Sequence, residues 1–141
     1  MSTVLWANHL LNSGEVRSDE NDKWALYKHA GRLDKLAGAA ELEPLSSLFD
    51  HTDIQFNMSG NELPEGTTST NELMARDGVW KSADDALAIL SGLLAVITAE
   101  KPRFGLMKND HETVVAELSE SIAYAKKASE LGAMFNFSVV M

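Results

Sequence analysis

The sequence contains no cysteine, which excludes a disulfide framework, a thiolate zinc site and a cysteine nucleophile. It also lacks a long apolar run, because the longest one, residues 86–99, is interrupted by Ser91, Gly92 and Thr98. A membrane-spanning helix needs about 20 apolar residues, so this run predicts a core helix. The N-terminus has no positively charged region ahead of its apolar residues, so a signal peptide is not indicated and we expect a cytoplasmic protein.

Basic residues are scarce. There are 12 Lys and Arg residues against 21 Asp and Glu residues, which gives a formal net charge of −9. The basic residues form no stripe, and a negative field repels both nucleic-acid phosphates and anionic lipid headgroups. We therefore expect neither a nucleic-acid nor a membrane partner. The acidity either keeps the protein soluble or favours a basic protein partner.

The length of 141 residues fits one domain, residues 1–141, and 45% of the residues are hydrophobic. A chain of this size buries enough surface to fold without disulfides or metals.

Apolar residues recur at helical spacing in three segments. These predict helices over 18–40, over 83–99 after a Ser82 cap, and from Asn109 or Asp110 to Leu131 before Gly132. The second helix is apolar on most sides, so we expect it in the middle of the domain, with another backbone close to Gly92. In the third helix, Glu117 is assigned to the solvated face and Leu131 to the buried face.

The C-terminal residues 133–141 alternate as a strand does, with Phe135, Phe137, Val139 and Met141 on one face and Asn136 and Ser138 on the other. This strand needs a partner, and residues 3–9 and 54–58 are the two candidates. Residues 3–11 alone fit either a strand or a short helix. The expected fold is α+β and mainly helical, with about three substantial helices packed on a small sheet that includes the C-terminal strand.

A polar segment, residues 59–70, has the composition of a loop. Ser69 and Glu72 form a capping box that predicts a short helix over 71–76. Long loops are often functional, so we expect a partner-binding surface here, with Glu62 and Glu65 in the loop and Trp80 beside it.

The cluster most like a metal site is Asp50, His51 and Asp53, since carboxylates and an imidazole together suit zinc, iron or manganese. The same aspartates are also typical of a turn or helix cap, and this second interpretation is favoured. A second group, Asp110-His111-Glu112, lacks the second histidine of the metalloprotease motif and is read as a helix start. No cofactor-binding motif is present.

A family resemblance covers residues 18–53. The segments Ser18-Asp19, Trp24 to His29, Leu33 to Ala37, Pro44 to Ser47, Phe49-Asp50 and Thr52-Asp53 resemble small uncharacterised bacterial proteins. The resemblance implies a bacterial, cytoplasmic origin and no particular activity.

Three functions are consistent with these features. The leading hypothesis is a small acidic interaction protein of the accessory or immunity type. The alternatives are a small metal-dependent hydrolase that uses Asp50, His51 and Asp53, and a ligand-binding homodimer.

Overall fold

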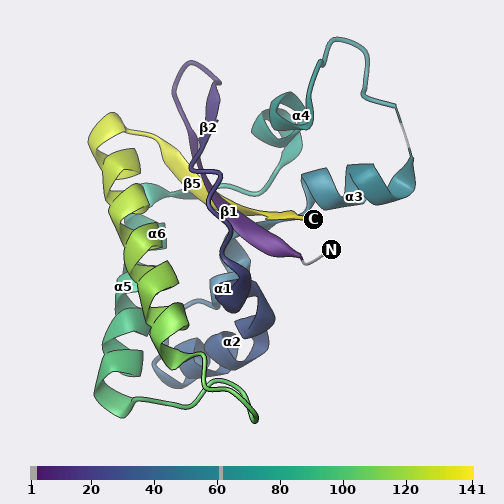
Figure 1. Ribbon diagram of the computed structural model, residues 1–141. Helices are drawn as coiled ribbons and strands as arrows, with labels where there is room; N and C mark the ends of the chain where they lie inside the picture. Colours follow the sequence, from purple (N-terminus) through teal and green to yellow (C-terminus); the bar gives the residue numbers. More distant parts are fainter. Residues whose placement is uncertain (1–2, 61) are drawn as a thin grey trace.

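The computed structural model describes residues 3–60 and 62–141, and these form an α+β fold (Figure 1). Five strands build one sheet: β1 (Val4–Leu10), β2 (Val16–Ser18), β3 (Phe49–Asp50), β4 (Lys81–Ser82) and β5 (Met134–Val140). The described helices are α1 (Trp24–Lys28), α2 (Ala30–Ala39), the 3-10 helix η1 (Leu45–Leu48), α3 (Thr52–Ser59), α4 (Thr70–Asp77), α5 (Ala83–Glu100) and α6 (His111–Leu131). The predicted fold class is confirmed, and α2, α5 and α6 are the three substantial helices.

The last strand, β5, is the centre of the sheet. It pairs antiparallel with β1 along its whole length, from Val4 opposite Val140 to Leu10 opposite Met134. The other edge of β5 pairs with β3 in parallel and with β4 antiparallel, while β2 extends the sheet beyond β1. Of the two predicted candidates, residues 3–9 are therefore confirmed as the partner of the C-terminal strand.

The prediction of a strand at 54–58 is wrong, because these residues belong to helix α3. The buried Asp50 accepts a hydrogen bond from the Thr52 backbone N–H, which satisfies a donor at the start of the helix. Gly60 closes the helix with a left-handed φ of 69°. The alternating apolar residues do not form one buried strand face. Ile54 packs against the core, but Met58 is 74% exposed.

The helix predicted over 18–40 is also wrong at its start. Residues 16–18 pair with β1, and Lys23 exchanges backbone hydrogen bonds with Leu5. The Asp19 carboxylate accepts the backbone N–H groups of Ala7 and Asn21, so this acidic residue fixes a turn beside the sheet instead of opening a helix. Helical structure begins at Trp24, and His29 separates α1 from α2.

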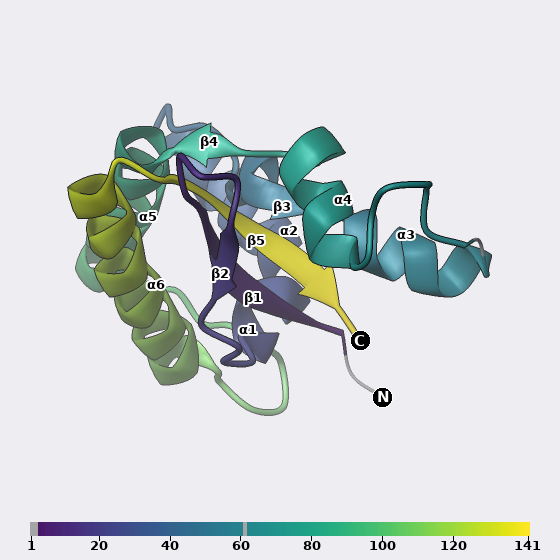
Figure 2. The same ribbon diagram turned by 90° about the horizontal axis from the view of Figure 1, so that it is seen from above.

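Helices α5 and α6 lie side by side on one face of the sheet, and α3 and α4 lie on its other side (Figures 1 and 2). The core between α5, α6 and the sheet is formed by large apolar side chains: Leu90, Leu93, Ile97, Val114, Leu118, Ile122, Phe135, Phe137 and Val139. None of the helices in residues 3–60 and 62–141 combines the length and hydropathy needed to cross a membrane.

The composition of helix α5 predicts a position in the middle of the domain, but one face of the helix is exposed. Its face with Ala88, Ser91, Ala95 and Ala99 is exposed, so small side chains at the surface account for its apolar character. Gly92 is approached by a side chain and not by a backbone, since a Cβ atom there would lie 2.6 Å from Leu42 Cδ1.

Two side chains of α6 lie opposite to their assignment from periodicity. Leu131 is 51% exposed, whereas Glu117 is only 7% exposed. The two carboxylate oxygens of Glu117 accept the backbone N–H groups of Ala25 and Leu26, at 3.3 and 3.0 Å. Glu117 thus caps α1, whose own preceding residue makes no side-chain cap. Burial raises the pKa of the Glu117 carboxyl, and the two backbone donors oppose that rise.

The Glu117 pKa predicts a pH dependence of stability. The folded-state pKa lies above the unfolded-state value, so the folded protein binds more protons between the two. The contribution of this group to the free energy of unfolding therefore falls as pH rises from about 4.5 through the folded-state pKa. In urea titrations, the stability of wild type minus that of Glu117→Gln should decrease over this range. Parallel curves would contradict the prediction, and the exposed Glu130→Gln serves as the control.

Candidate functional site

The face of the sheet opposite α5 and α6 carries a row of polar side chains. Strand alternation places Trp6 and Asn8 of β1 on this face, directly across from Ser138 and Asn136 of β5. The side-chain amides of Asn8 and Asn136 are buried and joined by a hydrogen bond of 2.9 Å. Asn136 Nδ2 also donates to the Val79 carbonyl at 2.8 Å. The Asn8 amide therefore donates to Asn136, which in turn donates to the backbone, and these bonds allow the two amides to be buried.

Helices α3 and α4 form a lobe, residues 52–60 and 62–77, beside this polar face (Figure 2). The lobe is connected internally by a hydrogen bond of 2.8 Å from the Thr70 hydroxyl to Asp53. Its C-terminal end is held by Trp80, whose indole N–H donates to the Met74 carbonyl at 2.9 Å. Ser69 caps α4 by accepting the Glu72 N–H, so the predicted capping helix is confirmed.

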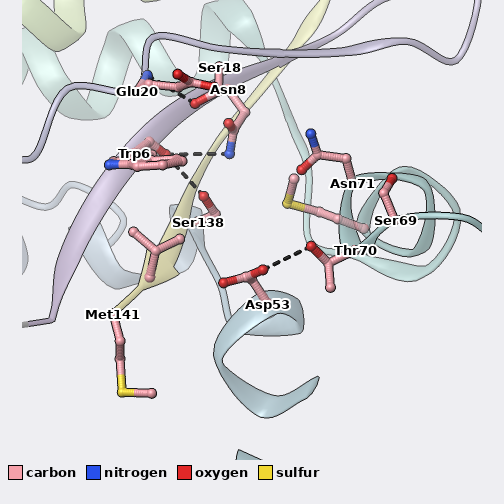
Figure 3. A pocket seen from close by; sticks show the side chains of 12 residues that line it. Trp6, Asn8, Ser18, Glu20, Asp53, Ser69, Thr70, Asn71, Ser138 and Met141 are labelled. Atoms are coloured by element: carbon pink, nitrogen blue, oxygen red, sulfur yellow. Dashed lines mark hydrogen bonds between the residues drawn. The ribbon is translucent and has the colours of Figure 1, made fainter. Parts of the chain in front are cut away.

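A cleft of about 330 Å³ lies between the lobe and the sheet (Figure 3). The sheet and the turn after β2 contribute aromatic, amide, hydroxyl and carboxylate groups, and the lobe contributes one carboxylate, two hydroxyl groups and one amide. The lining residues are Trp6, Asn8, Ser18, Glu20, Asp53, Ser69, Thr70, Asn71, Met74, Ser138, Val140 and Met141. This set contains two carboxylates and, within the part of the chain that the structure describes, no Lys, Arg or His.

Hydrogen bonds fix the Trp6 ring and the Glu20 backbone, and both residues line the cleft. The Trp6 indole N–H donates to Asp22 at 2.8 Å, which holds the orientation of the ring. Glu20 adopts a left-handed φ of 51°, which is uncommon for a residue other than glycine. The Glu20 backbone N–H is held in this turn by the Ser18 hydroxyl at 3.1 Å.

The structure distributes Asp50, His51 and Asp53 over different environments. Asp50 is buried, and its carboxylate accepts the Thr52 N–H, the Thr52 hydroxyl and the Val79 N–H at 2.9 to 3.1 Å. His51 is exposed at the N-cap of α3, whereas Asp53 lines the cleft. Over residues 3–60 and 62–141, no three His, Cys, Asp or Glu side chains are grouped to hold a metal ion. The bonds of Asp50 are those of a turn and cap residue.

The sequence-predicted partner-binding residues lie near the lobe but in separate places. Trp80 is half-buried and does not line the cleft. Glu62 lines a different hollow, a groove between α3 and α4. Glu65 is exposed in the turn that precedes α4.

Sequence reasoning missed Trp6, Asn8 and Ser138 as lining residues, although it placed Asn136 and Ser138 on the non-core face of the last strand. A second signal in the sequence is charge: residues 36–75 contain seven Asp and Glu residues and no Lys or Arg. This segment supplies most of the lobe.

Comparison of the chain with protein-family models, curated proteins and solved structures finds no match. The function must therefore be argued from the site itself.

Substitutions at Asp50 and His51 distinguish the cap interpretation from the metal interpretation. Asp50→Ala leaves the partly buried backbone N–H groups of Thr52 and Val79 without their acceptor and should lower the free energy of unfolding by about 2 kcal/mol. The exposed His51→Ala should change it by less than about 0.5 kcal/mol. Chemical denaturation measures both values. A stoichiometric metal in the wild type, lost in both variants by elemental analysis, would contradict this interpretation.

Proposed function

We propose that the protein is an interaction protein that binds a basic partner, and that the cleft receives a lysine or arginine side chain of that partner. The observation that carries the proposal is the cleft lining, which combines an oriented tryptophan with Asp53 and Glu20. Aromatic rings and carboxylates both attract ammonium and guanidinium groups.

The size of the cleft supports a single long side chain as its occupant. A volume of about 330 Å³ lies at the lower end of the range for small-molecule sites. The apolar atoms of Val140, Met141 and Met74 can contact the methylene groups of a lysine or arginine, whose charged end then reaches the carboxylates.

The surrounding charge supports the same type of partner. Four of the seven acidic residues within 36–75 belong to the lobe that forms one wall of the cleft: Asp53, Glu62, Glu65 and Glu72. Acidic residues around a binding site accelerate encounter with a basic protein and discriminate against anionic ligands, and both effects weaken with salt.

An accessory or immunity-type factor acts by binding another protein, which is what this cleft would provide. The bacterial origin and cytoplasmic location expected from the sequence belong to the same proposal.

The proposal is tested with an unstructured Gly-Ser octapeptide that contains two lysines. At 50 mM salt, calorimetry should detect binding to the wild type. Acetylation of both lysines, which removes their charge and keeps their stems, should abolish it. The double variant Asp53→Asn, Glu20→Gln should raise the dissociation constant at least about tenfold, since 1.4 kcal/mol corresponds to that factor.

The control variant is Glu112→Gln, which removes an exposed carboxylate outside the cleft. Equal binding of the acetylated peptide would contradict the proposal. So would an effect of Glu112→Gln as large as that of the double variant.

A further inference from the structure

The loop that joins α5 to α6, residues 101–110, presents two adjacent apolar side chains to solvent. Leu106 is 95% exposed and Met107 is 98% exposed, more than any other large apolar side chain in the described residues. Isolated apolar residues at a surface need no explanation, but two fully exposed neighbours at a loop tip form a contact-sized apolar projection.

This loop is held in one conformation by its own hydrogen bonds. Phe104 is fully buried, its N–H donates to the Asn109 side chain at 2.9 Å, and its carbonyl accepts the Asp110 N–H at 2.7 Å. The Arg103 guanidinium donates to the carbonyls of Gly105 and Leu106 at 2.8 and 3.0 Å. A fixed loop loses little conformational entropy when its tip is buried by a partner.

The loop tip is positively charged in a protein of net charge −9. Lys101, Arg103 and Lys108 are all exposed. The carboxylate of the loop, Asp110, is buried and faces His29 at 2.9 Å and Lys28 at 3.4 Å, and hydrogen bonding to His29 lowers its pKa. The tip therefore presents cations around an apolar centre.

A surface of complementary character lies on the α3–α4 lobe. The groove between α3 and α4 has a volume of about 420 Å³ and lies apart from the cleft. Its apolar lining comes from Phe56, Pro64 and Leu73. Glu62 places a carboxylate on it, whereas the Asp77 carboxylate is paired with Arg76 at 3.0 Å. The groove is an apolar hollow that carries the Glu62 carboxylate, whereas the loop tip is an apolar projection surrounded by cations.

We infer that the α5–α6 loop of one copy docks into the α3–α4 groove of a second copy, with Leu106 and Met107 in the groove. The loop and the lobe project from different parts of the molecule (Figure 1), so each copy offers its groove to another copy. Such a contact is head-to-tail and adds copies in a chain or a ring. A second copy is favoured as the occupant because its groove combines an apolar lining with the Glu62 carboxylate, opposite in charge to the exposed Lys101 and Lys108 of the loop.

The experiment is sedimentation equilibrium up to 1 mM protein at 50 and 500 mM salt. The wild type should associate at low salt and dissociate at high salt. Leu106→Ser with Met107→Ser should weaken association at least about tenfold, and so should Phe56→Ser alone. Met58→Ser, which removes an exposed apolar residue of α3 outside the groove, should associate like the wild type. Far-UV circular dichroism checks that each variant folds.

Mixing the two defective proteins gives the sharpest outcome. The loop variant retains its groove and the Phe56→Ser variant retains its loop, so an equimolar mixture should form a one-to-one dimer and nothing larger. A wild type that stays monomeric at 1 mM would overturn the inference, and so would a loop variant that associates like the wild type. Monomeric wild type that sediments with phosphatidylglycerol vesicles through Leu106 and Met107 would assign the loop to a membrane instead.

Discussion

The structure depends on one constraint: the final strand of the chain is the centre of the sheet. Every strand except β2 pairs with β5, so the sheet is complete only when residues 134–140 join segments far away in the sequence. The two faces of β5 have different roles. Phe135, Phe137 and Val139 face the core with α5 and α6, while Asn136 and Ser138 support the polar face. The polar face of β5 forms one wall of the cleft, and the lobe forms the other.

Buried polar groups attach the remaining elements to this sheet. Glu117 ties α6 to the start of α1, and Asp50 ties the start of α3 to Val79 beyond the end of α4. Glu117 accepts buried backbone donors and Asp50 accepts partly buried ones, and both donor pairs lose their acceptor when the carboxylate is removed. Asp50 and Asn136 also hold the segment after α4 against the sheet, and this keeps the acidic lobe beside Trp6 and Ser138. The charge of the lobe can then act on whatever enters the cleft.

The sequence predicts those parts of the fold that are decided locally. Helical periodicity, the Ser82 and Ser69 caps and Gly132 locate α4, α5 and α6, and alternation locates β5. The predictions fail where contacts with a distant segment determine the local structure or the burial of a side chain. Asp19 and Lys23 lie inside the predicted helix over 18–40 but pair with β1, and the buried Glu117 caps α1. The cleft combines residues more than 100 positions apart, such as Trp6 and Ser138, so spacing alone cannot reveal it.

The central claim is that a cationic side chain of the partner occupies the cleft beside Trp6. The most direct measurement is an isotope-filtered nuclear Overhauser experiment on the wild type with the two-lysine peptide bound. The account predicts contacts from the lysine ε-methylene protons to the Trp6 ring and to Thr70 and Met141. Contacts confined to Trp24 or Trp80 would place the peptide outside the cleft and contradict the account.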